Sequence, residues 1–172
     1  KGIRNQNELA QESSEIADFW NMLQGFQTSG KCIDRAHYRI RYMNSFRPIS
    51  AKEDIEFQEA RPILYLNMAA ISSLFNSRNM NATANRSNWS TIMSYLKSHA
   101  SYLGLKQDRF TILLPSGMPD YTIEIAGNNQ TIKKVKVNRP KALCFDYLQL
   151  KEMFGLDLET EIVEDDTEQD EY

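Results

Sequence analysis

The hydrophobic period of this chain changes at Gly104, and that change limits the folds open to it. Before Gly104, most apolar side chains recur at three- and four-residue spacing, which is typical of helices with one buried face. Beyond Gly104 they alternate with polar residues, which is typical of strands. A set of helices followed by hairpin-forming strands predicts an α+β fold.

Three helices are predicted before the change of period, over residues 7–28, 68–79 and 88–103. Gly104 is expected to end the third helix, and Ser87 or Asn88 is expected to cap its start. The helix over 88–103 has two unlike sides, because one is apolar and the other is rich in hydroxyl groups.

Two strands are predicted in the same half of the chain. Residues 38–42 alternate, which predicts a strand with Arg39 and Arg41 on one face. Residues 61–67 form a short apolar run, which suits a buried strand. Residues 44–60 show no core period, so we predict an exposed acidic loop there.

The second half of the chain reads mainly as strands. We predict a strand over 109–115, a β-hairpin made by 121–126 and 130–137, a short strand over 141–148 and a last helical turn or two over 148–155.

The net charge of −3 conceals two parts of opposite sign. Beyond Leu158 there are eight acids and no base, so residues 1–158 carry +5 and the end of the chain carries −8. The acids are Glu159, Glu161, Glu164, Asp165, Asp166, Glu168, Asp170 and Glu171. Such a split is typical of proteins with a nucleic-acid partner or an acidic interaction tail.

Two helices, a loop between them and a following basic hairpin are arranged in the order of a winged helix. We therefore expect a helix-plus-strand segment over residues 1–60, a winged-helix-like domain over 61–158 and an acidic disordered tail over 159–172.

A DNA-binding surface is predicted on the helix over 88–103 and on the hairpin. Hydroxyl groups and Lys97 on the helix can approach phosphates and base edges, and the bases of the hairpin neutralise phosphates. The candidate residues are Arg86, Ser94, Lys97, Ser98, Lys133, Lys134, Lys136, Arg139 and Lys141. Lysines on a solvated strand also prevent edge-to-edge aggregation, and Glu124 can pair with one of them.

Other residue types leave two interpretations open. Some tyrosines suit stacking on unpaired bases, although tyrosines at these spacings are more often core residues; they are Tyr38, Tyr42, Tyr95, Tyr102 and Tyr121. Arg39 and Arg41 on one strand face weakly favour contact with phosphates. Catalysis has little support, since the sequence has no phosphate loop, dinucleotide turn or nucleophile elbow. His37 with Cys32 makes no zinc site by itself, so we expect no bound metal. We also expect no enzyme activity and no cofactor.

The sequence also bears on location. It has no apolar run long enough for a membrane span and no signal-peptide segment, which predicts a cytoplasmic protein without membrane contact. Cys32 and Cys144 lie far apart, so no disulfide is expected. The first residue is Lys1 rather than Met, which suggests a piece of a larger protein with a further domain on its N-terminal side.

The order of these patterns resembles the C-terminal region of phage- and plasmid-type primase–helicases. The similar segments are "ILYLNMAAISSLF", "SNWSTIMSYLKSHASYLG", "RFTILL" and "KALCFDYLQL", which together span about Arg61 to Leu150. The resemblance implies a non-catalytic, winged-helix-like domain of a DNA replication or mobile-element protein, with an ATPase motor elsewhere in the parent. Acidic, aromatic-ended tails on phage replication proteins further imply a replication-protein partner for the tail.

Two alternatives stay open. In the first, the chain is a protein-interaction or oligomerisation module that dimerises through Phe19, Trp20 and Phe26 and has no affinity for nucleic acid. Alternatively, it is a regulatory domain in which the acidic tail competes with DNA for the basic hairpin.

Overall fold

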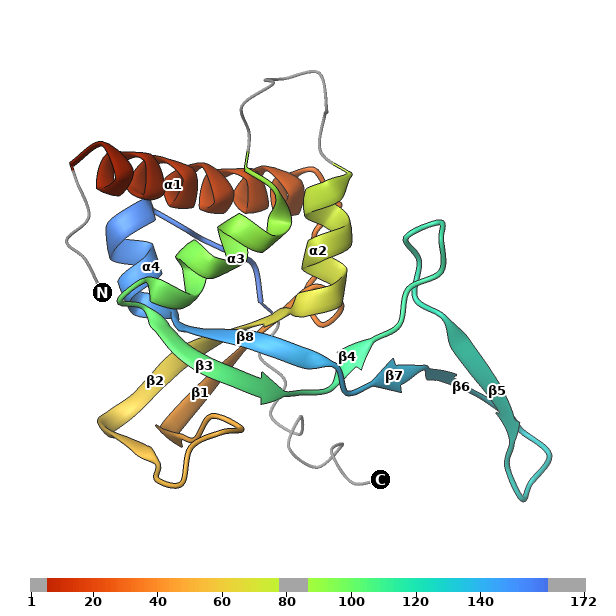
Figure 1. The fold of residues 1–172 in the computed structure, drawn as a ribbon. Coiled ribbons are helices and arrows are strands. Elements are labelled where there is room, and N and C mark those ends of the chain that lie inside the picture. Colours follow the sequence, from red (N-terminus) through yellow and green to blue (C-terminus); the bar gives the residue numbers. More distant parts are fainter. Residues whose placement is uncertain (1–5, 78–86, 161–172) are drawn as a thin grey trace.

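The computed structural model describes residues 6–77 and 87–160, and in this part of the chain the predicted α+β fold is confirmed. Helices cover one face of a four-stranded antiparallel sheet with the order β1-β2-β8-β3 (Figure 1). The elements are α1 (Gln6–Thr28), β1 (Tyr38–Phe46), β2 (Ile55–Asn67), α2 (Met68–Asn76), α3 (Trp89–Ser98), β3 (Tyr102–Gln107), β4 (Phe110–Thr111), β5 (Tyr121–Ile125), β6 (Thr131–Val135), β7 (Val137–Asn138), β8 (Lys141–Asp146) and α4 (Tyr147–Phe154).

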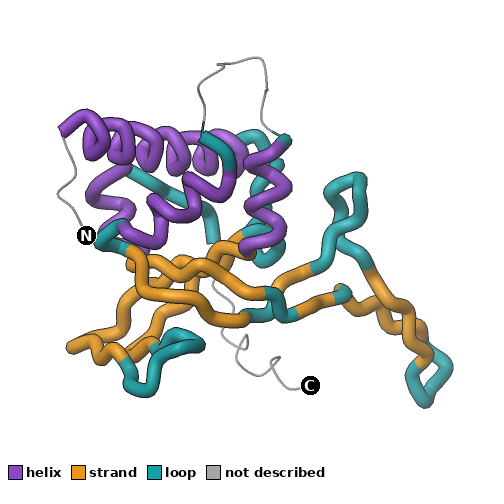
Figure 2. Tube along the Cα trace, viewed as in Figure 1, coloured by secondary structure: helices purple, strands orange, loops and turns teal. Residues whose placement is uncertain are grey.

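An arm of two short sheets leaves this body between β3 and β8 (Figure 2). β4 pairs with β7 next to the body, and β5 pairs with β6 farther out. A backbone hydrogen bond joins the two sides of the arm just before β5 begins: the amide of Lys136 donates to the carbonyl of Asp120 at 2.8 Å.

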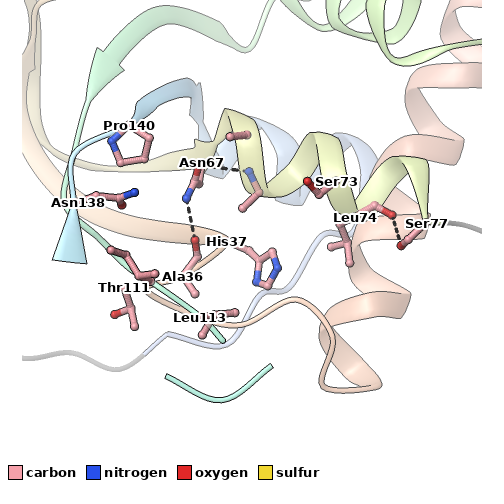
Figure 3. Close-up of a pocket in the computed structure, with 13 residues that line it drawn as sticks. Ala36, His37, Asn67, Ser73, Leu74, Ser77, Thr111, Leu113, Asn138 and Pro140 are labelled. Atoms are coloured by element: carbon pink, nitrogen blue, oxygen red, sulfur yellow. Dashed lines mark hydrogen bonds between the residues drawn. The ribbon is translucent and has the colours of Figure 1, made fainter. Parts of the chain in front are cut away.

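Asn67 joins three elements where β2 passes into α2 (Figure 3). Its side-chain amide donates to the carbonyl of Ala36 at 3.0 Å, and its Oδ1 accepts from the amide of Ala70 at 3.3 Å. Asn67 is therefore the N-cap of α2, and it also anchors the segment that leads into β1.

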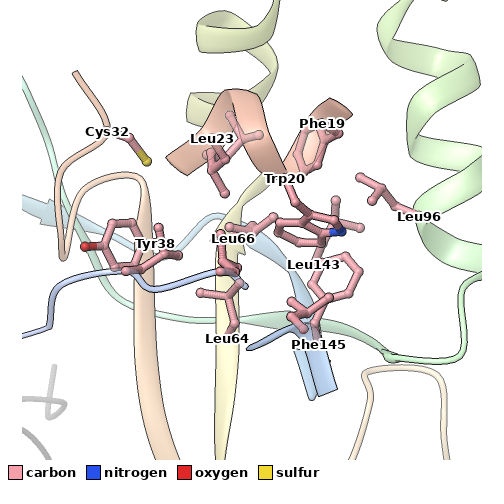
Figure 4. Packing of buried hydrophobic residues seen from close by; sticks show 14 of the residues in the cluster. Phe19, Trp20, Leu23, Cys32, Tyr38, Leu64, Leu66, Leu96, Leu143 and Phe145 are labelled. Atoms are coloured by element: carbon pink, nitrogen blue, oxygen red, sulfur yellow. The ribbon is translucent and has the colours of Figure 1, made fainter. Parts of the chain in front are cut away.

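The main core lies between the helices and the sheet (Figure 4). Phe19, Trp20 and Leu23 of α1 are buried there, as the helical spacing predicted. They meet Leu66 of β2 and Phe145 of β8, and the Trp20 and Phe145 rings lie edge to face at 5.1 Å.

A smaller core occupies the other face of the sheet. Ile63, Tyr65 and Cys144 point to that face because side chains alternate along β2 and β8, and Phe46 and Phe110 cover them. The run at 61–67 is therefore buried on both faces, which confirms the predicted central strand.

The boundary expected at residue 60 does not divide the folded body. β2 crosses it, running from Ile55 to Asn67, and α1 lies in the same core as β2 and β8. The acidic tail lies outside the described residues from 161 onward, as does the segment 78–86.

Three predicted boundaries were wrong. Residues 44–60 were expected to be a loop, but β1 continues to Phe46 and β2 already begins at Ile55. The helix expected over 88–103 ends at Ser98, and residues 102–107 form β3 instead. The strand expected over 109–115 is reduced to Phe110–Thr111.

The chain leaves the helical conformation at His99, which has φ −74° and ψ 148°. Gly104 lies within the strand that follows, with a φ of +136°, and a Cβ built there would lie 2.6 Å from Cβ of Pro48. The segment pairs with β8 instead, through Tyr102 opposite Phe145 and Leu105 opposite Leu143. Sheet pairing therefore outweighs the local helical pattern.

Candidate nucleic-acid interface

The predicted β-hairpin is confirmed and forms the outer half of the arm. We refer to β5, β6 and their turn, residues 121–135, as the ribbon. Tyr121 lies opposite Val135 and Ile125 lies opposite Thr131, so the ladder has no register shift. All ten strand residues of the ribbon are exposed. In the described part of the chain, then, the ribbon contributes nothing to either core.

The two faces of the ribbon differ in polarity, because side chains alternate along each strand. One face carries Tyr121, Ile123 and Ile125, and across from them Val135, Lys133 and Thr131. The opposite face carries Thr122, Glu124, Ile132 and Lys134. Ile123 is 71% exposed and Ile125 is 76% exposed, so the first face, which we call the isoleucine face, presents apolar groups to water.

The structure places four of the five predicted bases of the hairpin region on the arm, and the fifth, Lys141, is the first residue of β8 at its base. Lys133 lies over the Tyr121 ring at 4.0 Å, Lys134 pairs with Glu124 at 3.0 Å and Lys136 pairs with Asp120 at 3.3 Å. The pairing of Glu124 with a lysine that the sequence left open is thus confirmed. The pair of Lys134 with Glu124 is exposed, and exposed pairs yield readily to a stronger anion, whereas Asp120 in the other pair is half-buried.

Arg139 and Lys141 lie where the arm returns to the body, and both are exposed. Residues 120–141 hold two acids and five bases, so this segment carries a charge of +3. Beyond Glu124, the next carboxylate in the sequence is Asp146, so the outer end of the ribbon is free of acids.

The predicted residues of α3 are exposed but lie apart from the ribbon. Ser94, Lys97 and Ser98 face solvent as expected. In Figure 1 the ribbon projects on the far side of α2 from α3, so the two do not form one continuous surface. The Ser98 hydroxyl also donates to the carboxylate of Glu12 at 3.0 Å, which puts a negative charge beside the helix. Arg86 lies outside the described residues.

The arginines of β1 serve the fold rather than a phosphate track. Arg41 donates two hydrogen bonds to the carboxylate of Asp108, at 2.8 and 2.9 Å. Arg39 is buried and donates to the carbonyl of Arg109 at 3.0 Å. Both arginines hold the segment between β3 and β4 against the sheet.

The tyrosines divide between core and surface. Tyr38 is buried, and its hydroxyl donates to the carbonyl of Glu159. Tyr42 and Tyr121 are exposed, and Tyr121 belongs to the isoleucine face of the ribbon. Tyr121 is thus the tyrosine placed next to the predicted lysines.

A pocket of about 480 Å³ lies at the base of the arm (Figure 3). Its wall carries no side chain of Asp, Glu, Lys or Arg. The residues that line it are Ala36, His37, Asn67, Ala69, Ala70, Ser73, Leu74, Ser77, Thr111, Ile112, Leu113, Asn138 and Pro140. Sequence reasoning missed this pocket, because its residues come from the segment before β1, the end of β2, α2 and the base of the arm, and share no local pattern.

Its titratable group, His37, is committed to the fold. Nδ1 of His37 accepts from the amide of Ile33 at 3.0 Å, which fixes the neutral ring with its proton on Nε2. Burial lowers the pKa of His37. Asn67 is likewise satisfied by Ala36 and Ala70, so the wall offers few polar groups to a ligand.

The remaining reactive side chains are buried. Burial raises the pKa of the Cys32 thiol to about 12 and also raises the pKa of Cys144, so both are protonated near neutral pH. The two are free cysteines, in line with the expected absence of a bridge between them. In residues 6–77 and 87–160, no three His, Cys, Asp or Glu side chains converge in a way that could hold a metal ion.

Searches with this sequence and this structure found no similar protein from which a role of the site could be inferred. No family profile, curated protein or solved structure matches the chain. The resemblance to primase–helicases therefore rests on the sequence patterns alone. No helix in the described residues has the length and apolar character of a membrane span.

Proposed function

We propose that this chain is a non-catalytic nucleic-acid-binding domain and that the ribbon, with Arg139 and Lys141 behind it, is its main binding element. The observation that carries the proposal is a two-stranded ribbon that projects from the body with every strand residue exposed, within a segment, residues 120–141, that holds five bases against two acids. Two-stranded ribbons of this kind enter the grooves of duplex DNA.

The physical basis is phosphate neutralisation. Each lysine or arginine that meets a phosphate releases a condensed counterion, so affinity depends strongly on salt. The pair Lys134–Glu124 is solvent-exposed and costs little to break, and in the pair Lys136–Asp120 the lysine is exposed. Phosphate contacts of this type position a protein without reading sequence, so we expect weak sequence preference.

The finer predictions from the sequence belong to this proposal. The order α2, α3 and then a hairpin supports a winged-helix-like arrangement, whereas the separation of α3 from the ribbon argues for the ribbon as the primary contact. Membership of a DNA replication or mobile-element protein is supported by the primase–helicase resemblance. The proposal gives Ser94, Lys97 and Ser98 a secondary role.

Fluorescence anisotropy with labelled duplex and single-stranded DNA at low salt tests the proposal. The variant Lys133→Ala/Lys134→Ala/Lys136→Ala is expected to weaken binding at least about tenfold and to reduce the salt slope by up to about three. The matched control is Lys31→Ala/Lys52→Ala/Lys151→Ala, which removes the same charge from exposed sites away from the arm. Equal losses in both variants, or none in either, would remove the ribbon from the binding site.

A protein-interaction module is the second candidate, and one observation favours it. Ile123 and Ile125 expose apolar surface of the kind that contacts other proteins. The dimer expected through Phe19 and Trp20 is not available to the folded chain, because both are buried in the main core. Light scattering over a range of concentrations tests this candidate: a stable dimer without affinity for nucleic acid would favour it.

A further inference from the structure

We propose, resting on the function above, that the isoleucine face of the ribbon lies against the base pairs of duplex DNA in the minor groove. Ile125 and Ile123 insert between neighbouring base pairs, and the duplex bends. The ligand is thus double-stranded DNA that unstacks easily, and the apolar face, rather than the lysines, produces the deformation.

The first support is the position of the two isoleucines. Ile125 is the last residue of β5 before the turn, and Ile123 lies next to it on the same face. They are 76% and 71% exposed, which is more than any other large apolar residue described. Minor-groove proteins use such apolar wedges to unstack a base step and kink the duplex.

The second support is the chemistry around them. Lys133 lies directly across from Ile123 on the same face, where its ammonium group can meet a flanking phosphate. The turn beyond Ile125 contains Asn128, Asn129 and Gln130, whose amides suit the hydrogen-bonding edges of the minor groove. No carboxylate lies on the isoleucine face, so nothing on it repels the polyanion.

The same residues disfavour a second copy of the chain as the occupant. The pair Ile123 and Lys133 lies at the centre of the isoleucine face. Two ribbons packed face to face about a two-fold axis at that centre would place each Lys133 opposite Lys133 or Ile123 of the other copy, so two ammonium groups would enter one apolar contact. Like charges placed opposite one another oppose such pairing.

The experiment measures bending and unstacking separately from binding. A short duplex with a fluorophore at each end reports bending by energy transfer, and a fluorescent adenine analogue inside the duplex reports unstacking. The wild-type chain is expected to raise both signals at saturation. The variant Ile123→Thr/Ile125→Thr keeps β-branched residues in the strand but is expected to lose both signals, with binding about five- to tenfold weaker.

Two further variants sharpen the result. Ile132→Thr makes the same change on the opposite face of the ribbon and is expected to bend DNA like the wild type. Ile123→Val/Ile125→Val shortens the wedge without making it polar, and it is expected to give intermediate bending. This second variant keeps the test valid if threonine loosens the ribbon.

The outcomes separate the two proposals. Salt-sensitive duplex binding without bending or unstacking by the wild type would overturn the wedge and leave the proposed function intact. Absence of any DNA binding would overturn both. Loss of a dimer in the Ile123→Thr/Ile125→Thr variant, with DNA binding unchanged, would assign the isoleucine face to a protein partner instead.

Discussion

Gly104 occupies a position on β3 where a side chain would be strained and would clash with Pro48. Its φ of +136° lies in the region that side chains avoid, and Cβ and Cγ of Pro48 would lie 2.6 and 2.7 Å from an added Cβ. The contact also ties the segment after β1 to β3, since the amide of Ile49 donates to the carbonyl of Leu105 at 2.9 Å.

Replacing Gly104 with alanine is expected to lower the free energy of unfolding by about 2–4 kcal/mol, because backbone strain and a steric clash add. Urea denaturation followed by circular dichroism measures the change. Gly25→Ala is the matched control, because Gly25 lies in α1 with no atom within 4 Å of an added Cβ. That variant is expected to gain about 0.5–1 kcal/mol. Equal effects of the two substitutions would contradict the close contact.

His37 makes stability depend on pH. Burial lowers its pKa in the fold, so the unfolded chain takes up a proton first as the pH falls through the ordinary value of 6.5. Burial lowers the pKa of His99 as well. Stability from both groups is therefore complete above pH 6.5 and falls below it, by at most about 1.4 kcal/mol per pH unit for each histidine.

Urea denaturation at about pH 7.5 and about pH 5.5 measures this fall, a range in which most carboxylates stay ionised. The double variant His37→Asn/His99→Asn keeps an acceptor oxygen for the amides of Ile33 and Ser101 but cannot take up the proton. Its stability is expected to change much less over this range. A fall as steep as that of the wild type would show that other groups cause it.

At the scale of elements, the sequence predicted what depends on local spacing. Helix α1, the central strand at 61–67 and the hairpin all follow from their apolar periods, and all are confirmed. Residues 55–60 escaped prediction because that half of β2 is exposed except for Phe57, so its ladder with β1 leaves no apolar alternation.

The errors in the candidate site have the same physical origin. Ser98 and Glu12 are 86 positions apart, and the partners of Arg39 and Arg41 lie about 70 positions away, so no local pattern reveals them. The isoleucine face was missed for another reason. Alternation of Tyr121, Ile123 and Ile125 with polar residues is typical of a strand with one buried face, but the structure leaves that face exposed.

Because the ribbon lies outside both cores, it is expected to be separable from the fold. Asp120 and Lys136 are already joined by a backbone hydrogen bond, so residues 121–135 can be replaced by a two-residue Asn-Gly turn. The free energy of unfolding is expected to change by less than about 1 kcal/mol, because no buried apolar area is lost. Duplex binding is expected to disappear. A large loss of stability would show that the ribbon supports the body.

The whole molecule combines a basic body with an acidic end. Residues 161–172 hold seven acids and no base, so the net charge without them is +4 instead of −3. Net charge acts over the range of the screening length, and it therefore affects the approach of a polyanion even without a specific contact.

Truncation after Thr160 is expected to tighten duplex binding at low salt severalfold, as the hypothesis of a regulatory tail also predicts. Anisotropy titrations of the truncated and full chains measure the difference, and repetition at high salt should reduce it. Truncation of the triple lysine variant shows whether the gain depends on the ribbon. Identical affinities of the two chains at low salt would exclude an inhibitory effect of the tail.

The backbone hydrogen bond between Asp120 and Lys136, at the base of the ribbon, also restricts how relatives of this chain can differ. If one residue were inserted in each strand just beyond this hydrogen bond, every side chain farther out on the ribbon would move to the opposite face, because side chains alternate along each strand. Only the addition or removal of two pairs preserves which face carries the isoleucines. The reach of the arm can therefore vary only in steps of about 7 Å.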